Sequence, residues 1–323
     1  MPIQIALLVV FCVTLIKSTE AIIVSIKHLA RRMKVSSFGI TAFILAFATS
    51  LPELIVGITA SIEGIPEVVV GNILGSNIAD ISLVIGGAAL AGGTLKVTGK
   101  AIKRDLYLVF GAAMLPVLLI EDLVLSRSDG IVLLIVYLFF VVTVMRGHAR
   151  AVGEHAFGES PMHRLLLAVT RKGGRGDFVK FVMGAAGLLI SSHLIVQLAK
   201  GIASGLGVPI LVIGLFLVAV GTSLPELVFE MKAVVAGRAQ MALGDLLGSI
   251  VANATMILGI SAVINPIRLS NGLAPYLTAI GAFVLLYGLF FFFSRSKSKL
   301  TRWEAMALIL VYFGFVVLEL GRV

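Results

Sequence analysis

The chain has 323 residues, of which 59% are hydrophobic and only 13% are charged, and its net charge is +9. A soluble domain of this length needs many more charged residues to cover its surface, so the composition excludes an ordinary soluble protein. It predicts an all-α integral membrane protein.

Ten apolar segments follow one another along the chain, each close to the length of about 20 residues with which a helix crosses a bilayer. None is amphipathic enough to have a solvated face, which excludes the buried helices of a large soluble protein. The first segment is not typical of a cleaved signal peptide, because Met1–Gln4 carries no cation and the apolar run is long. The predicted spans are 3–26, 37–62, 66–92, 105–124, 129–146, 178–203, 208–236, 240–264, 273–293 and 302–320.

The basic residues between these spans predict their orientation. If the N-terminus lies outside, most of the 26 lysines and arginines fall in segments on the inner side, namely 27–34, 96–104, 146–180, 232–238 and 295–302. Inner loops of membrane proteins carry such an excess, so both termini are predicted to lie outside. These cations line one membrane face, so the positive net charge requires no nucleic-acid partner.

The chain contains an internal repeat. Thr-Ser-Leu-Pro-Glu-Leu occurs at 49–54 and again at 222–227, and Gly-x-x-x-Gly-Ser occurs at 71–76 and at 244–249. Both pairs are related by the same offset of 173 residues. The offset corresponds to five spans, an odd number, so the two copies are predicted to lie upside down relative to one another.

This pattern is typical of the inverted repeats of secondary transporters, whose substrate site lies at the repeat interface near the membrane midplane. We therefore expect ten transmembrane helices arranged as two inverted five-helix repeats, 1–146 and 178–323. The polar, basic segment 147–177 between them is predicted to be a cytoplasmic linker.

The first repeated motif is suited to binding cations. Pro52 and Pro225 lack an N–H group, so each leaves a carbonyl in the preceding turn without its helical partner. Such carbonyls are tolerated at membrane depth only in a polar cavity or within protein. Hard cations such as Ca²⁺ and Na⁺ bind all-oxygen shells. The motif adds hydroxyl and carboxylate oxygens from Thr49, Ser50, Glu53, Thr222, Ser223 and Glu226.

The second motif predicts the opposite wall of the site. Its polar residues are spaced by four, which places them on one stripe of a helix. They are Asn72, Ser76 and Asp80 in the first copy and Asp245, Ser249 and Asn253 in the second. The glycines at 71, 75, 244 and 248 remove side-chain bulk, so we expect close helix contacts there.

Four acidic residues at membrane depth, Glu53, Asp80, Glu226 and Asp245, carry the functional prediction. Each costs about 3 kcal/mol or more at the bilayer centre, and no basic residue is predicted at the same depth. A bound cation or protons must therefore neutralise them. Hydroxyl and amide residues such as Ser50 are weaker candidates, because they often only pack helices. A fifth acidic residue, Glu230, is expected either in an inner vestibule or in solvent.

With these motifs the chain resembles the Ca²⁺/cation antiporter superfamily, in its prokaryotic sodium/calcium exchanger branch. The resemblance covers nearly the whole chain and implies a multi-pass protein of a prokaryotic cell membrane, acting as a monomer or weak homo-oligomer. It implies that Glu53 and Glu226 bind Ca²⁺ and contribute to flanking Na⁺ sites. It also implies that the first and sixth spans slide across a fixed core.

The same resemblance implies roles for the remaining site residues. Further oxygen ligands would come from Thr49, Ser50, Thr222 and Ser223 and from the backbone carbonyls of Ala46 and Ala219. Ser76 and Ser249 would complete Na⁺ sites, with Asp80 and Asn253 as paired polar residues. Asp80 and Asn253 are reversed relative to prokaryotic relatives, and Asp245 stands where asparagine is usual.

The predicted function is therefore exchange of Ca²⁺ for Na⁺, with no cofactor. The additional carboxylates leave open an exchange of Ca²⁺, or of another divalent cation, for H⁺. A cation channel is a further alternative. An enzyme is not expected, because the chain lacks a His-Glu-x-x-His motif, and its single cysteine, Cys12, cannot form a thiolate metal site.

Overall fold

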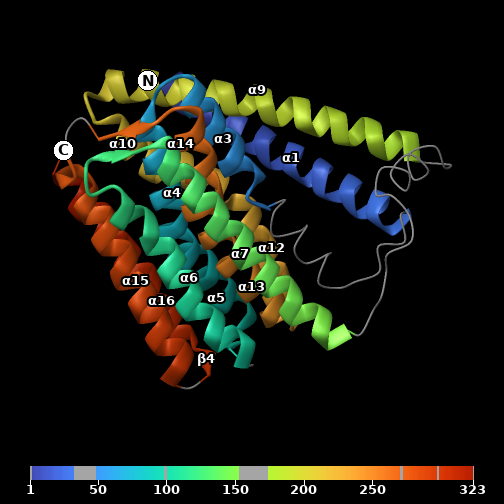
Figure 1. The fold of residues 1–323 in the computed structure, drawn as a ribbon. Coiled ribbons are helices and arrows are strands. Elements are labelled where there is room, and N and C mark those ends of the chain that lie inside the picture. Colours follow the sequence, from blue (N-terminus) through green and yellow to red (C-terminus); the bar gives the residue numbers. More distant parts are fainter. Residues whose placement is uncertain are drawn as a thin grey trace.

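The computed structural model describes residues 2–32, 49–97, 100–152, 174–269, 272–296 and 298–322. Nearly all of this chain is helical (Figure 1). The helices of the first half are α1 (Pro2–Arg32), α3 (Leu51–Ile62), α4 (Pro66–Ala79), η1 (Asp80–Val84), α5 (Ile85–Gly92), α6 (Lys100–Leu119) and α7 (Arg127–Val152). Those of the second half are α9 (Gly174–Leu206), α10 (Ile210–Ile213), η2 (Gly214–Val218), α11 (Ala219–Thr222), α12 (Leu224–Val235), α13 (Ala239–Val251), η3 (Ala252–Ile257), α14 (Leu258–Ile264), η4 (Ala274–Tyr276), α15 (Leu277–Ser296) and α16 (Arg302–Leu320).

A helix is present at each predicted span where the chain is described, with ends that differ from the prediction by several residues. Of the predicted span 37–62, residues 37–48 lie outside the described residues. Six described helices are long and apolar enough to cross a membrane, and a seventh span results if the bent pair 210–222 and 224–235 is counted as one. The chain is thus a multi-pass membrane protein. The helices α7 and α9 extend into the predicted linker, of which residues 153–173 are not described.

Four strands of two residues each are an exception to the predicted all-α class. β1 (Leu95–Lys96) pairs with β4 (Lys299–Leu300), and β2 (Val124–Leu125) pairs with β3 (Ile267–Arg268), both antiparallel. Each pair joins two loops that were predicted on the same side of the membrane. The two chain ends lie together at the end of the bundle opposite β4 (Figure 1).

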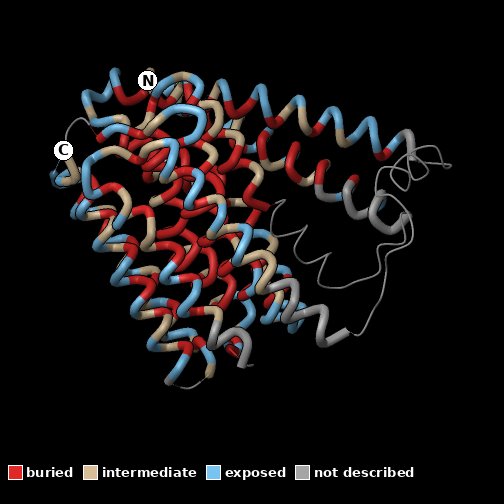
Figure 2. The backbone as a smooth tube through the Cα atoms, viewed as in Figure 1, coloured by how far each residue is buried: buried red, intermediate tan, exposed pale blue. Residues whose placement is uncertain are grey.

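Two long helical stretches form the buried centre of the bundle. The stretch 66–92 consists of α4, η1 and α5, and the stretch 239–264 consists of α13, η3 and α14. In an apolar 18-residue part of each stretch, 83% and 78% of the residues are buried. They run in opposite directions, since α5 and α13 lie toward one end of the bundle and α4 and α14 toward the other (Figure 1). In Figure 2 the buried backbone follows these helices through the middle of the molecule. Each changes to a π-helix at its polar stripe, a feature common at functional sites.

Glycines allow α4 to lie directly against the segment 210–219. A Cβ atom added at Gly71 would lie 2.8 Å from the carbonyl oxygen of Leu211, and one at Gly75 would overlap the carbonyl oxygen of Leu215. The predicted close helix contact is therefore present at both residues. At Gly244 it is not, because no described atom lies within 4 Å of such a Cβ.

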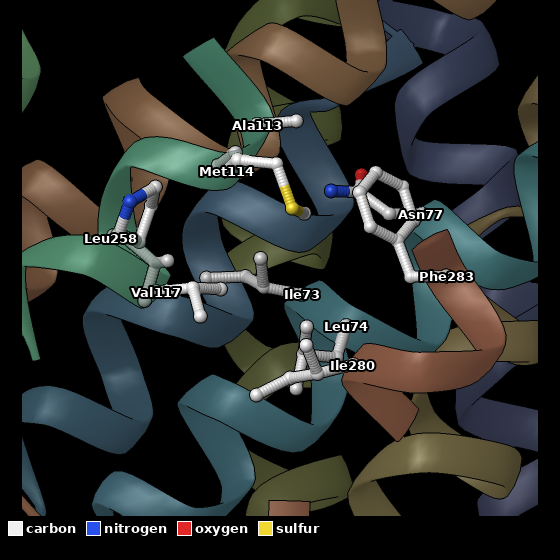
Figure 3. A pocket seen from close by; sticks show the side chains of 11 residues that line it. Ile73, Leu74, Asn77, Ala113, Met114, Val117, Leu258, Ile280 and Phe283 are labelled. Atoms are coloured by element: carbon white, nitrogen blue, oxygen red, sulfur yellow. The ribbon is translucent and has the colours of Figure 1, made fainter. Parts of the chain in front are cut away.

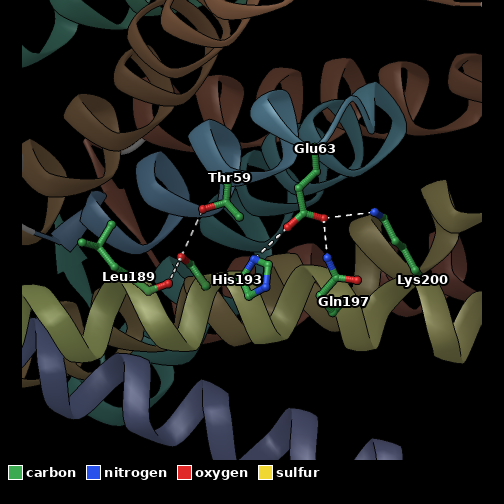
Figure 4. Close-up of polar contacts among 7 residues, drawn as sticks. Thr59, Glu63, Leu189, His193, Gln197 and Lys200 are labelled. Carbon is green, nitrogen blue, oxygen red and sulfur yellow. Dashed lines mark hydrogen bonds and ion pairs between the residues drawn. The ribbon is translucent and has the colours of Figure 1, made fainter.

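The first helices of the two halves, α1 and α9, lie along one another at the side of the bundle (Figure 1). Polar contacts attach α9 to the end of α3 (Figure 4). Glu63 accepts hydrogen bonds from Gln197 (2.7 Å) and Lys200 (3.0 Å), and its second oxygen lies 2.9 Å from Nδ1 of His193. The pair α1–α9 is thus held to the central helices partly through polar contacts.

Candidate cation-binding site

The site is built on a broken helix of the second half and on the start of the corresponding helix, α3, in the first half. The helix that ends at Thr222 resumes at Leu224 after a bend of 43°, and Ser223 between them has φ −79° and ψ 3°. The first half repeats this geometry, since Ser50 has φ −81° and ψ 6° and α3 begins at Leu51. Pro52 and Pro225 stand in the first turns of the resumed helices, where a missing N–H group does no harm. Each break therefore places a hydroxyl and a carboxylate side by side in the protein centre.

Hydrogen bonds join the broken helix of each half to the polar stripe of the other half. Thr49 donates to Oδ1 of Asp245 (3.1 Å), and its repeat counterpart Thr222 donates to Oδ1 of Asn72 (3.1 Å). The carboxylate of Asp245 and the amide of Asn72 thus occupy equivalent positions in the two halves. Asp245 introduces a negative charge where the other half has a neutral amide.

Hydroxyl groups of the two halves also meet, and Asn253 of the second stripe bonds an amide of the first half. Ser50 donates to Oγ of Ser249 (3.1 Å), and the hydroxyls of Ser76 and Thr222 are 3.4 Å apart. Asn253 donates from Nδ2 to Oδ1 of Asn77 (3.0 Å). These contacts form a continuous polar layer between the two halves.

The four predicted carboxylates are buried in this layer with free oxygen atoms. Glu53, Asp80, Glu226 and Asp245 are each no more than 3% exposed. One oxygen of each has no hydrogen-bond partner within the described part of the chain, although the other oxygen of Glu53 accepts a long bond from Ser223 (3.5 Å). Among the described residues none of the four has a basic ion-pair partner. Buried charges require a counter-charge, so this layer is suited to a bound cation.

The carboxylates are distributed through the layer rather than gathered at one point. Within the described ranges no three acidic, histidine or cysteine side chains converge on a common metal position. A cation here would therefore be held by one or two carboxylates together with hydroxyl and carbonyl oxygens, which is the shell that Ca²⁺ and Na⁺ accept.

The structure places almost every predicted site residue in this layer. Those described are buried, namely Thr49, Ser50, Glu53, Asn72, Ser76, Asp80, Ala219, Thr222, Ser223, Glu226, Asp245, Ser249 and Asn253. The carbonyl oxygen of Ala219 accepts bonds from the backbone of Ser223 and the hydroxyl of Thr222. Ala46 lies outside the described residues.

The sequence analysis did not predict Asn77 as a site residue and predicted the wrong environment for Glu230. Asn77 bonds Asn253, but its repeat counterpart is Ile250, so comparison of the copies gave no signal. Glu230 was expected in a vestibule or in solvent and is instead fully buried. Its position one turn after Glu226, on the same helix face, was the available signal.

A small cavity beside the layer is apolar. Its volume is about 30 Å³, room for about one water molecule. Figure 3 shows Asn77 at one side of it, with Ile73, Met114 and Phe283 among the apolar side chains around it. None of the four carboxylates lines it, so it is not the cation site.

The fold and the buried, oxygen-rich layer between its halves are typical of a multi-pass membrane transporter. The family model described as sodium/calcium exchanger protein matches residues 3–146 and 177–321. The chain belongs to the sodium/calcium exchanger family.

Individual relatives agree with this assignment. The chain is 30% identical to the sodium/calcium exchanger MaX1 of Methanosarcina acetivorans, over 94% of this chain and 95% of the relative. It is 35% identical to the putative antiporter CaxA of Alkalimonas amylolytica, over 79% and 78%. A solved structure of the sodium-calcium exchanger NCX_Mj, soaked with Na⁺ and Sr²⁺, matches with a TM-score of 0.65 at 26% identity and covers 98% of each chain.

Proposed function

We propose that this protein is a secondary antiporter that exchanges Ca²⁺ for Na⁺ across the membrane by alternating access. The observation that carries this proposal is the buried polar layer between the two halves. It contains four carboxylates with unpartnered oxygens, and no described basic residue forms an ion pair with them. The family and the solved exchanger structure support the same function.

The two glutamates at the helix breaks are the proposed Ca²⁺ ligands. Glu53 and Glu226 begin α3 and α12, and each has a buried oxygen without a partner. Thr49, Ser50, Thr222 and Ser223 would add hydroxyls, and Ala46 and Ala219 backbone carbonyls. The Na⁺ positions would share these atoms and use the stripe residues Asn72, Ser76, Asp80, Asp245, Ser249 and Asn253.

The proposed architecture is ten spans in two inverted five-helix repeats. Three observations support it. The central stretches 66–92 and 239–264 run in opposite directions. Their π-helical segments begin at Asp80 and Ala252, so that Asp80 and its counterpart Asn253 both lie within them. The two small sheets each join a loop of one half to a loop of the other.

Electrostatics makes the exchange obligatory. A group of carboxylates without bound cations is too costly to enclose within a membrane protein, so only a neutralised site changes sides. Ca²⁺ and Na⁺ compete for shared oxygens, so the protein changes between its outward-facing and inward-facing states with either Ca²⁺ or Na⁺ bound. Ca²⁺ therefore crosses in one direction and Na⁺ in the other. The helices α1 and α9, which pack on one another beside the core, are the proposed moving elements.

The deciding experiment is ⁴⁵Ca²⁺ uptake into proteoliposomes loaded with Na⁺, compared with vesicles loaded with K⁺ or choline at equal pH. We expect uptake only with internal Na⁺. Uptake that is independent of internal Na⁺ and is driven by an imposed pH gradient would instead establish Ca²⁺/H⁺ exchange. Flux without any counter-ion would indicate a channel.

Proton coupling is the second candidate function, and the carboxylate of Asp245 favours it. This residue occupies the position that Asn72 has in the other half, and its Oδ2 atom is buried without a partner. An additional carboxylate at this position could carry a proton during the cycle.

A further inference from the structure

Glu230 is a buried carboxylate for which the proposed Ca²⁺ and Na⁺ ligands give no role. It lies on α12 one turn after Glu226 and is 0% exposed. Among the described residues, neither of its oxygens has a hydrogen-bond partner. Two unsatisfied oxygens on a fully buried carboxylate are unfavourable unless a ligand binds them.

The repeat shows that Glu230 is not required by the fold. Its counterpart in the first half is Gly57, where an added Cβ would lie 2.9 Å from Ile257 and 3.3 Å from Ser261. One half therefore fills this position by direct helix packing. The other half carries a carboxylate there.

A second departure from the repeat lies on the next helix. Asp245 replaces the amide of Asn72 and lies on α13, which a short turn joins to α12 and which packs against α12. The hydroxyl of Thr49 bonds Oδ1 of Asp245 and leaves Oδ2 without a partner. Glu230 and Asp245, neither of which has an acidic counterpart in the first half, thus lie on contacting helices, and both have oxygens without a partner among the described residues.

We propose that Glu230 and Asp245 bind an additional Na⁺ ion, on the side of the central site that faces the α12–α13 turn. This proposal rests on the proposed function, which supplies Na⁺ to the site. Two carboxylates with free oxygens form an all-oxygen environment for a small hard cation. Lys232 in the last turn of α12 and Arg238 in the connection to α13 are basic, so the position lies toward the predicted inner side of the membrane.

The test is a count of bound Na⁺ in the purified full-length protein, by equilibrium dialysis with ²²Na⁺ at fixed pH and without Ca²⁺. We expect Glu230→Gln to bind one Na⁺ fewer per chain than the unaltered protein. Glu121→Gln, an exposed residue after α6, is the matched control and should retain the full count. If Glu230→Gln does not fold, Glu230→Asp is used, and it should keep the count with a several-fold weaker Na⁺ affinity.

Equal Na⁺ counts in Glu230→Gln and the unaltered protein would overturn the proposal. If the Na⁺ counts are equal and Glu230→Gln binds one proton fewer than the unaltered protein in a potentiometric titration, Glu230 holds a proton rather than Na⁺. That result would also overturn the proposal. ⁴⁵Ca²⁺ exchange is measured on the same preparations. Failure of the unaltered protein to exchange Ca²⁺ would refute the proposed function alone, because the Na⁺ count does not depend on transport.

Discussion

At the scale of single residues, the site depends on carboxylates that have no described basic partner. Glu53 and Glu226 are related by the repeat, and both begin a helix immediately after a break. An N-terminal helix position favours negative charge, which partly offsets the penalty of burial. The remaining penalty is what a transported cation removes on binding.

Removing either glutamate charge should abolish exchange. We expect Glu53→Gln and Glu226→Gln each to reduce Na⁺-dependent ⁴⁵Ca²⁺ uptake by more than about tenfold, because a lost charge–cation contact is worth more than ~1.4 kcal/mol. Glu121→Gln, at an exposed position, is the control and should transport normally. Full activity in either glutamate variant would refute its assignment as a Ca²⁺ ligand.

The effect of Asp245 should be smaller. Asp245→Asn gives the second half the amide that Asn72 provides in the first, and the new carbonyl oxygen can still accept the bond from Thr49. We therefore expect Na⁺-driven uptake to persist with a several-fold higher Na⁺ requirement. The measurement is initial ⁴⁵Ca²⁺ uptake against internal Na⁺ concentration. Complete loss of Na⁺-driven uptake would show that Asp245 is essential rather than a modifier.

At the scale of elements, the broken helices and the glycine contacts position the site. The break at Ser223 turns α12 by 43° relative to the preceding helix, which directs Glu226 into the layer. The close approach at Gly75 brings the stripe of α4 against the other half. The break depends on the missing N–H group of Pro225, and the close approach depends on the missing side chain of Gly75.

Restoring the N–H group should weaken transport. Pro225→Ala supplies a donor to the carbonyl of Gly221 and favours a continuous helix across Ser223. We expect several-fold slower ⁴⁵Ca²⁺ uptake with little change in thermal stability. Pro275→Ala, in the first turn of the short helix η4 in the connection between α14 and α15, is the control. Equal uptake in the two variants would show that the break is not needed for transport.

Adding a methyl group at Gly75 should destabilise the protein. The new Cβ overlaps the backbone of Leu215, which cannot move as a flexible side chain could. We expect Gly75→Ala to lower the free energy of unfolding by about 3 kcal/mol, the upper part of the usual range for overpacking. Gly111→Ala, with no atom within 4 Å of its added Cβ, should be neutral. The unfolding temperature in detergent compares the two, and an equal value in both would contradict the packing described here.

At the scale of the whole molecule, loops far apart in sequence meet at the two ends of the bundle. The loop at Leu95 pairs with that at Leu300, and the loop at Val124 with that at Arg268. The first pair lies near basic residues such as Arg302, and the second lies toward the end that holds both termini. Because cytoplasmic loops are enriched in lysine and arginine, the end with β4 should face the cytoplasm.

This orientation can be measured with cysteine labelling. The buried Cys12 is first replaced in Cys12→Ala, which leaves a chain without thiols. A membrane-impermeant maleimide should label Glu121→Cys in intact cells. It should label Lys299→Cys only after the membrane is permeabilised. The reverse pattern would place the termini inside and would contradict the predicted orientation.

Much of the fold and site could be predicted because the signals that indicate them lie within short segments of the sequence. Span positions follow from runs of apolar residues, and the second motif lies within one helical stretch in each half, so its spacing alone placed Asn72 and Ser76, and likewise Asp245 and Ser249, on one face. The hydrogen bonds from Thr49 to Asp245 and from Thr222 to Asn72 could not be predicted in this way. They depend on how two helices from different halves are rotated against each other.

The sequence by itself determined the membrane class, the positions of the described spans, the family and the candidate ligands, because hydrophobicity and motif spacing act within one segment. Only the tertiary structure decided that Glu230 is buried on a helix that packs against that of Asp245, and that Asn77 joins the layer. It alone showed that Glu63 holds α9 to α3. These facts arise from contacts between helices far apart in sequence, where burial and pairing depend on the arrangement in space rather than on the order of residues.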